Sequence, residues 1–387
     1  MAPRRLRLGM VGGGDGAFIG AVHRIAARLD DCYEIVAGAL SSEPEKASAS
    51  AAAIGLDPAR SYSDYREMAR QEALRADGID AVAIVTPNYL HAPVASALLD
   101  AGIHVICDKP LAISLAEGEA LSALARARNR VFALTHVYAG YPMVRHARSM
   151  VEAGEIGEVR LVQVEYAQDW LADAANQGDD YQRHNWHNDP LRAGPTGCVG
   201  DIGTHAYHLA GFVSGMLPSE VLAELHAFTP NRRLDDHVQV MLRYANGARG
   251  MLWSSQMATG CENALRLRVF GSKASIAFDQ ENPNELWVTP QGGCAQRITR
   301  GRAGSAPAEA ATRVPSGHPE GYIEAFAQLY REAAAQIHAV NDGLPVPDSL
   351  RLMPTVDDGI DGLRFIDAVL DSDRRGSAWV PVRPGQS

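Results

Sequence analysis

A carboxylate and an imidazole stand four residues apart in the sequence, at Asp201 and His205. If Asp201 opens a helix, this spacing places both side chains on one helical face. A carboxylate beside an imidazole can orient the ring, set its tautomer and raise its basicity, which suits removal of a proton from a hydroxyl group. The spacing also allows a purely structural interpretation, in which Asp201 caps the helix and His205 is a hydrogen-bonded core histidine.

A second candidate is Lys109, which is followed by Pro110 and lies just after the apolar run 104–107. At the end of a buried strand, this lysine would direct its ammonium group into a cleft. Most Lys-Pro pairs after a strand form surface turns, so the role of Lys109 depends on the fold around it.

The elements that must position Lys109 alternate between strand and helix over the first third of the chain. Strand-like apolar runs cover residues 6–12, 34–40, 79–85, 104–107 and 131–134, with helical segments between them. This alternation predicts an α/β Rossmann domain, with a doubly wound parallel sheet, over residues 1–138. Ligands of such sheets bind beyond the carboxyl ends of the strands, where residues 86–88 and Lys109 fall.

A glycine cluster at residues 12–16 joins the first strand to a helical segment over residues 17–28. Backbone amides at a helix start can hold a pyrophosphate, and a Cβ in the turn would block its close approach. A glycine turn alone is weak evidence for such a site. Its place at the same sheet edge as Lys109 strengthens the prediction of a dinucleotide site.

After about residue 155 the pattern changes to alternating strands with short connections, including the hairpin turn Asn246-Gly247. This pattern predicts an α+β second domain over residues 139–387, with a large, mostly antiparallel open sheet. A final helix over residues 349–370 is expected to pack back on the first domain. The strand-like runs cover residues 159–166, 220–228, 237–244, 248–254, 265–270 and 274–278.

Composition excludes several classes of partner. The chain has 387 residues and a formal net charge of −10, whereas nucleic-acid binding needs a basic face. Its five cysteines are scattered without a Cys-x-x-Cys pair, so neither a disulfide framework nor a metal site is expected. No apolar run approaches the ~18 residues that span a membrane. We therefore expect a cytoplasmic protein that binds neither nucleic acid nor membrane.

Together these motifs resemble the Gfo/Idh/MocA oxidoreductases, the family of glucose–fructose oxidoreductase and inositol dehydrogenase. The resemblance covers nearly the whole chain and includes its closing region, residues 361–380. Its motifs are the glycine turn with His23 after it, Thr86-Pro87-Asn88-Tyr89-Leu90-His91, Asp108-Lys109-Pro110, Gly154-Glu155-Ile156-Gly157-Glu158-Val159 and Gly200-Asp201-Ile202-Gly203-Thr204-His205.

The resemblance implies that Lys109, Asp201 and His205 form the catalytic group. His205 would be the general base, Lys109 would position the reacting oxygen and stabilise its negative charge, and Asp201 would hydrogen-bond the substrate. A nicotinamide would accept the hydride. The resemblance also implies that the open sheet packs against another subunit, giving a homodimer or homotetramer.

The implied cofactor contacts depart from the family pattern in detail. The turn carries about three residues more than Gly-x-Gly-x-x-Gly-x-x-His, so contacts are expected at Gly12, Gly14 and the backbone of Phe18 and Ile19. Serines end the second strand, near a lysine, and could bond either ribose hydroxyls or a 2′-phosphate, so family frequency favours NAD while NADP stays open. The other expected contacts are Ser41, Ser42, Lys46, Thr86, Pro87, Asn88, His91, Asp108 and Lys109.

Residues that could stack on a sugar or bond its hydroxyls gather in two segments. The expected substrate contacts are His136, Tyr138, Trp170, His184, Trp186, His187, Arg192, Asp201 and His205. The loop 169–187 could instead pack at a subunit contact.

The expected function is that of an NAD(P)-dependent oxidoreductase that acts on a secondary hydroxyl of a sugar, inositol or glycoside. One alternative is an NAD-dependent glycosidase, which would use transient oxidation, elimination and re-reduction. A second is a non-catalytic cofactor-binding regulator, which the presence of Lys109 and His205 disfavours.

Overall fold

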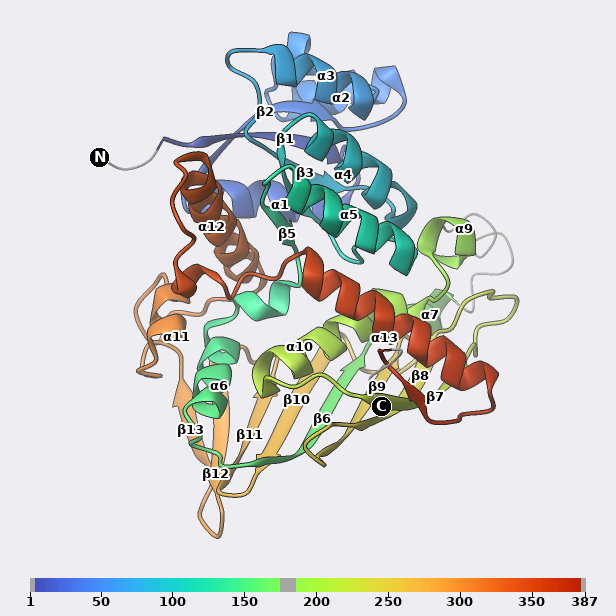
Figure 1. The fold of residues 1–387 in the computed structure, drawn as a ribbon, viewed down its shortest axis with the longest axis vertical. Helices are drawn as coiled ribbons and strands as arrows, with labels where there is room; N and C mark the ends of the chain where they lie inside the picture. The colour runs from blue at the N-terminus through green and yellow to red at the C-terminus, as the bar shows by residue number, and fades with distance from the viewer. Residues whose placement is uncertain (1–3, 175–185, 384–387) are drawn as a thin grey trace. The chain divides into compact units, whose positions relative to one another are not determined.

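The structure is a computed structural model that describes residues 4–174 and 186–383. The chain forms two compact units (Figure 1). The first comprises Met1–Gly140 and Tyr322–Ile360, and the second comprises Tyr141–Gly321 and Asp361–Ser387. The sequence prediction places the boundary at residues 138–139, close to Gly140, but assigns all of 139–387 to the second domain.

The first unit contains a five-stranded sheet in the order β2-β1-β3-β4-β5, and every pair in it is parallel. Strands β3 and β4 are buried along their whole length, as expected for a sheet covered on both faces. The predicted doubly wound fold is confirmed. Its elements are β1 (Leu6–Gly12), α1 (Phe18–Leu29), β2 (Tyr33–Ala39), α2 (Pro44–Ala53), α3 (Tyr65–Leu74), β3 (Ala81–Val85), α4 (His91–Asp100), β4 (His104–Cys107), α5 (Leu115–Ala127) and β5 (Phe132–Leu134).

Helix α12 (Tyr322–Asn341) returns to this first unit late in the chain and packs on α1. The ring of His23 lies 5.0 Å from that of Phe326, and its Nδ1 is 2.8 Å from the Tyr330 hydroxyl. Burial lowers the pKa of His23 to about 4, so the ring is neutral at pH 7. This buried seam explains why residues 322–360 belong with the first unit.

The region of the predicted last helix belongs to both units, because the boundary between the units falls after Ile360. It consists of a short 3₁₀ turn (Asp348–Leu350) and α13 (Val356–Arg374). The start of α13 contacts the first unit, where Asp357 pairs with Arg126 at 2.8 Å. Later in the helix, Phe365 stacks on Tyr207 of the second unit with ring centroids 4.3 Å apart.

The second unit is built on a nine-stranded sheet in the order β13-β12-β11-β10-β6-β9-β8-β7-β14. The prediction of a large, mostly antiparallel sheet is confirmed, but β6 does not lie next to β7, its successor in the chain. It lies between β9 and β10 and pairs with β9 in parallel. The strands are β6 (Val159–Ala167), β7 (Glu220–His226), β8 (His237–Arg243), β9 (Arg249–Ser255), β10 (Ala264–Gly271), β11 (Ala274–Asp279), β12 (Glu285–Pro290), β13 (Gln296–Thr299) and β14 (Val380–Pro381).

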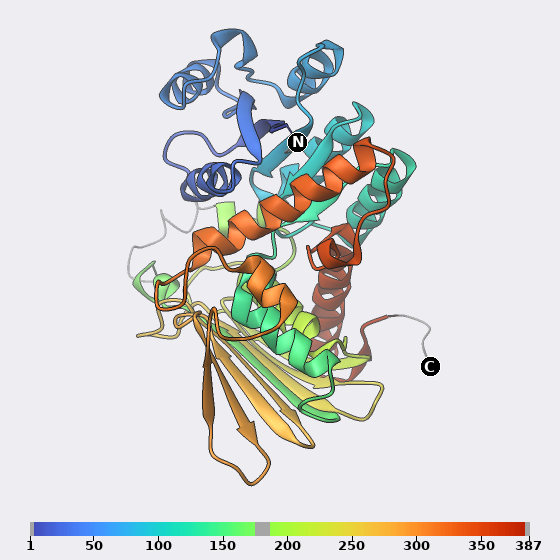
Figure 2. The same cartoon turned by 90° about the vertical axis from the view of Figure 1, so that its left-hand side faces the viewer.

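One face of this sheet is covered by helices, among them α6 (Pro142–Glu152) and α10 (Thr204–Ser214) (Figures 1 and 2). The strands alternate accordingly: Val162 and Val164 are buried on the covered face, while Gln163 and Glu165 on the other face are partly exposed. The shorter helices of this unit are α7 (Trp170–Ala174), α9 (Pro190–Ala193) and α11 (Ala306–Ala311).

No helix in the described ranges 4–174 and 186–383 is long and apolar enough to cross a membrane.

Candidate active-site residues

The glycine turn after β1 is shaped by close backbone packing. Gly12 and Gly13 have φ values of +79° and +69°, a region that glycine adopts without strain. A Cβ on Gly20 would lie 2.4 Å from the Gly13 carbonyl oxygen, so α1 sits directly against the turn. A Cβ on Gly14 would lie 2.7 Å from the carbonyl oxygen of Leu40, at the end of β2. The extra residues between Gly14 and Gly20 therefore do not remove the helix contact.

The first turn of α1 has no side-chain cap on its amides. Helix α1 begins at Phe18, and its N-cap residue Ala17 has no side-chain oxygen to cap the first turn. Arg24 holds the turn from within the helix by donating to the Gly13 carbonyl at 2.6 Å. A turn with no room for a Cβ, beside a helix start that no side chain caps, fits the pyrophosphate of a dinucleotide.

At the end of β2, the serines expected near the adenosine ribose lie in a surface turn. Ser41 Oγ accepts a hydrogen bond from the amide of Glu43 at 3.1 Å. Glu43 in turn forms an exposed ion pair with Lys46, at 2.7 Å. Glu43 is the residue that the sequence prediction omits here, although it is the acidic side chain nearest the strand end.

Lys109 lies in a loop after β4 that is fixed on both sides. The carboxylate of Asp108 accepts hydrogen bonds from the Thr135 hydroxyl at 2.8 Å and from the Lys109 amide at 2.9 Å. On the other side of Lys109, the carbonyl oxygen of Pro110 lies 2.6 Å from Nδ1 of His91. The Lys109–Pro110 peptide bond is cis. The structure thus brings His91, Asp108 and Lys109 together in the first unit, while their contact with a cofactor stays a prediction.

Asp201 does not open a helix. It lies within a π-helical turn, Val199–Gly203, and α10 begins after it at Thr204. The turn is capped by Asp235, whose carboxylate accepts hydrogen bonds from the amides of Gly197 at 2.7 Å and Val199 at 2.8 Å. Asp201 is therefore not the N-cap residue of this turn or of α10, whose N-cap residues are Cys198 and Gly203. Single π turns occur frequently at functional sites.

Asp201 is oriented by a residue that the sequence pattern does not reveal. Gln256 is completely buried just after β9, and its Nε2 donates to Oδ2 of Asp201 at 2.8 Å. His205 is only 8% exposed, and the ring of Tyr166 lies 6.3 Å from its ring. Burial raises the pKa of the capping Asp235 to about 6. No spacing in the sequence links Gln256 to Asp201, since 55 residues separate them.

The remaining substrate candidates are divided between the two units. His136 and Tyr138 lie in the first unit and are each 3% exposed. In the second unit Trp186 stacks on His187 at 3.7 Å, and Trp170 donates to Gln168 at 3.2 Å. Arg192 lies in α9, and His184 lies outside the described residues. In the part of the chain that the structure describes, no three His, Cys, Asp or Glu side chains are arranged to hold a metal.

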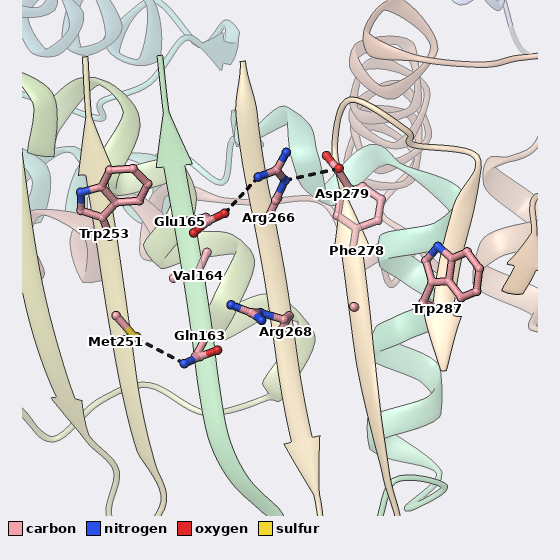
Figure 3. A pocket seen from close by; sticks show the side chains of 11 residues that line it. Gln163, Val164, Glu165, Met251, Trp253, Arg266, Arg268, Phe278, Asp279 and Trp287 are labelled. Atoms are coloured by element: carbon pink, nitrogen blue, oxygen red, sulfur yellow. Dashed lines mark hydrogen bonds and ion pairs between the residues drawn. The ribbon is translucent and has the colours of Figure 1, made fainter. Parts of the chain in front are cut away.

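A hollow on the exposed sheet face is separate from all of these residues. Figure 3 shows that its side chains come from β6, β9, β10, β11 and β12. Arg266 bridges Glu165 and Asp279 across it, at 3.4 Å to each. None of the predicted cofactor or substrate residues lines it.

Comparison with protein-family models identifies the chain. Residues 6–136 match the oxidoreductase family with an NAD-binding Rossmann fold, and residues 144–277 match the GFO/IDH/MocA C-terminal domain. The chain belongs to the Gfo/Idh/MocA family. It follows that the first unit of this Gfo/Idh/MocA oxidoreductase is an NAD-binding domain. The close packing of the glycine turn against α1 agrees with this assignment.

Three relatives of this Gfo/Idh/MocA protein extend over its full length. The crystal structure of an oxidoreductase from Sinorhizobium meliloti is 51% identical with a TM-score of 0.88, and covers 98% of this chain and 100% of its own. An inositol dehydrogenase homolog from Azotobacter vinelandii, solved with NAD+, is 35% identical with a TM-score of 0.92 and coverages of 98% and 97%. The same homolog has also been solved with NADH and myo-inositol. Levoglucosan dehydrogenase from Pseudarthrobacter phenanthrenivorans is 29% identical, with 98% of each chain covered.

Proposed function

We propose that this protein is an NAD-dependent dehydrogenase that oxidises a secondary hydroxyl of a sugar, an inositol or a glycoside. The observation that carries the proposal is the setting of Asp201 and His205. Asp235 caps the π turn that carries Asp201 and leads into α10, and buried Gln256 holds the Asp201 carboxylate. Relatives along the full chain include a levoglucosan dehydrogenase and an inositol dehydrogenase homolog, whose names support a carbohydrate substrate.

Each of three residues has a role in this proposal. His205 removes the hydroxyl proton, and its low exposure limits competition from water. The ammonium of Lys109 donates to the reacting oxygen and stabilises its developing negative charge. Asp201 accepts a hydrogen bond from the substrate and favours the protonated form of His205.

NAD, when bound, accepts the hydride that leaves the same carbon. The residues that would hold it are Gly12 and Gly14, the amides of Phe18 and Ile19, and the loop 86–88. Ser41 and Ser42 would bond the adenosine ribose. Relatives solved with NAD+ and with NADH support NAD over NADP.

The proposal is tested by a screen of sugars, inositols and glycosides with NAD and with NADP, including myo-inositol and levoglucosan. We expect steady production of NADH, followed by absorbance, with at least one polyol or sugar. Cleavage of a nitrophenyl glycoside without net NADH would instead establish the glycosidase alternative. Cofactor binding without any turnover across the screen would favour a regulator.

A homo-oligomer formed through the exposed sheet face is also part of the proposal. The face carries Trp253, Trp287 and Met251, residue types that interfaces favour (Figure 3). It also carries both signs of charge, with Arg266 and Arg268 beside Glu165 and Asp279, so it is complementary to a second copy of itself.

A further inference from the structure

His91 lies between two backbone carbonyl oxygens, and a neutral histidine can donate a hydrogen bond to only one of them. The side chain is 1% exposed at the start of α4. Its Nδ1 lies 2.6 Å from the carbonyl oxygen of Pro110, and its Nε2 lies 2.9 Å from the carbonyl oxygen of Thr86. The second distance is that of an ordinary hydrogen bond, and the first is slightly shorter than the usual range.

The two partners of His91 can only accept. A carbonyl oxygen has no proton to give, and a neutral imidazole carries one N–H and one lone pair. With a single N–H, one ring nitrogen would face a carbonyl oxygen lone pair to lone pair, which is repulsive. Both bonds form only when both ring nitrogens are protonated.

We propose that His91 is a buried imidazolium that joins the carbonyl of Thr86 to the carbonyl of Pro110 and is thereby a positioning residue for Lys109. We call this pair of hydrogen bonds the His91 bridge. The consequence for catalysis rests on the role of Lys109 proposed above, whereas the protonation state of His91 does not.

The His91 bridge completes the fixation of the lysine loop. Before Lys109, the loop is held by Asp108, whose amide donates to Ile84 at 2.9 Å and whose carboxylate accepts from Thr135. After Lys109, the bridge holds the carbonyl of the next residue. The far end of the bridge is Thr86, which follows β3 and lies in the loop expected to contact the cofactor. The bridge therefore fixes the distance between the cofactor loop and the Lys109 backbone.

Charges near His91 act in both directions. Burial is the largest effect and lowers the pKa of His91 below its ordinary value of 6.5, and the Lys109 ammonium acts the same way. The two carbonyl hydrogen bonds and the Asp108 carboxylate act to raise it. His23, on α1, is near enough for a charge on His91 to lower its pKa, and His23 is itself neutral at pH 7. Because the bonds need both protons, the bridge is present in the protonated form and is lost as pH rises through the pKa.

The direct test is nitrogen NMR of the full-length protein labelled with ¹⁵N-histidine, without cofactor or substrate. We expect both His91 nitrogens to be of the protonated type at pH 5 and one of them to lose its proton as the pH rises, with the assignment made from a His91→Gln variant. His104 is an internal control, because its Nδ1 accepts from the Val131 amide and its Nε2 contacts the Asn341 side-chain oxygen, as in a neutral ring. A neutral His91 at pH 5, with one unprotonated nitrogen, would overturn the proposal.

A kinetic test addresses the positioning role, with whichever of myo-inositol or levoglucosan the enzyme oxidises. His91→Gln should lower kcat by about 10- to 100-fold, since small displacements of a catalytic group cost rates of that order. KM and NADH affinity should change by smaller factors than kcat, because the glycine turn and the start of α1 are retained while the loop 86–88 loses one anchor. His104→Gln, at the opposite end of β4, should reduce thermal stability without lowering kcat.

Three kinetic outcomes contradict the role of the bridge. One is an unchanged kcat in His91→Gln, and another is a loss of kcat that only parallels a loss of NADH binding. The third is a His91→Gln protein that matches His104→Gln in every respect. The NMR measurement needs no turnover. It therefore decides the protonation state of His91 even if the protein proves not to be a dehydrogenase.

Discussion

Gln256 controls the position of the Asp201 carboxylate through one hydrogen bond to a charged acceptor. Such bonds contribute about 1.5–3 kcal/mol, so Gln256→Leu should lower kcat/KM by roughly 10- to 100-fold. Steady-state kinetics with the best substrate of the screen measures the effect. Gln328→Leu is the control, since Gln328 is also buried but donates to Glu332 in α12. Equal losses in both variants would mean that Gln256 has only a structural role.

His23 predicts a pH dependence of stability. Burial lowers its pKa to about 4, so between pH 6.5 and pH 4 the unfolded chain binds a proton at His23 that the folded chain does not bind. Stability from this group is therefore present above the unfolded pKa near 6.5 and lost as pH falls toward 4. Between pH 7 and pH 5 the free energy of unfolding should fall by about 2 kcal/mol through this group.

Urea unfolding at pH 7 and pH 5 measures this loss in wild type and in His23→Gln. The variant should show a pH dependence smaller by about that amount. His318→Gln, which changes an exposed histidine, should behave as wild type. An unchanged pH dependence in His23→Gln would show that His23 accepts its proton in the folded protein.

Among the elements, the turn between β1 and α1 depends on contact between Gly13 and Gly20. Gly20→Ala places a Cβ 2.4 Å from the Gly13 carbonyl oxygen, so the turn and helix must separate. We expect NADH affinity to fall at least tenfold, measured by fluorescence titration. Gly362→Ala, in α13, meets no atom within 4 Å and should leave NADH binding unchanged while strengthening its helix. Unchanged NADH affinity in Gly20→Ala would place the cofactor elsewhere.

The parallel sheet was predictable because its strands are short apolar runs that end in glycine or polar residues. The π turn at Val199–Gly203 was not, because its cap comes from Asp235, more than thirty residues along the chain. The pairing of β6 with β9 could not be predicted from the sequence either. Alternation within a strand identifies its buried face but does not identify its neighbours.

At the scale of the whole molecule, the sequence locates the break near Gly140 because the strand–helix alternation stops there. It does not show that Tyr322–Ile360 rejoins the first unit, since helix α12 carries an apolar face that could cover either sheet. Only the packing of α12 on α1, through the Phe326 and Tyr330 contacts with His23, decides this.

The exposed sheet face predicts an oligomer at this same scale. Trp287 is 46% exposed on it, so Trp287→Asp should bury a charge in the proposed interface and reduce the molar mass in solution. Light scattering after size exclusion measures the change. Leu74→Asp, at an 86% exposed position in α3, should leave the mass unaltered. A wild-type protein that is already monomeric would contradict the proposal.

The central claim is that Lys109 and His205 carry out the chemistry on a bound carbohydrate. The most direct measurement compares wild type with Lys109→Ala and His205→Ala for NADH production and, in parallel, for NADH binding. We predict that turnover is abolished in both variants while the dissociation constant for NADH stays within about threefold of wild type. Turnover retained in both variants would contradict the assignment of the catalytic residues.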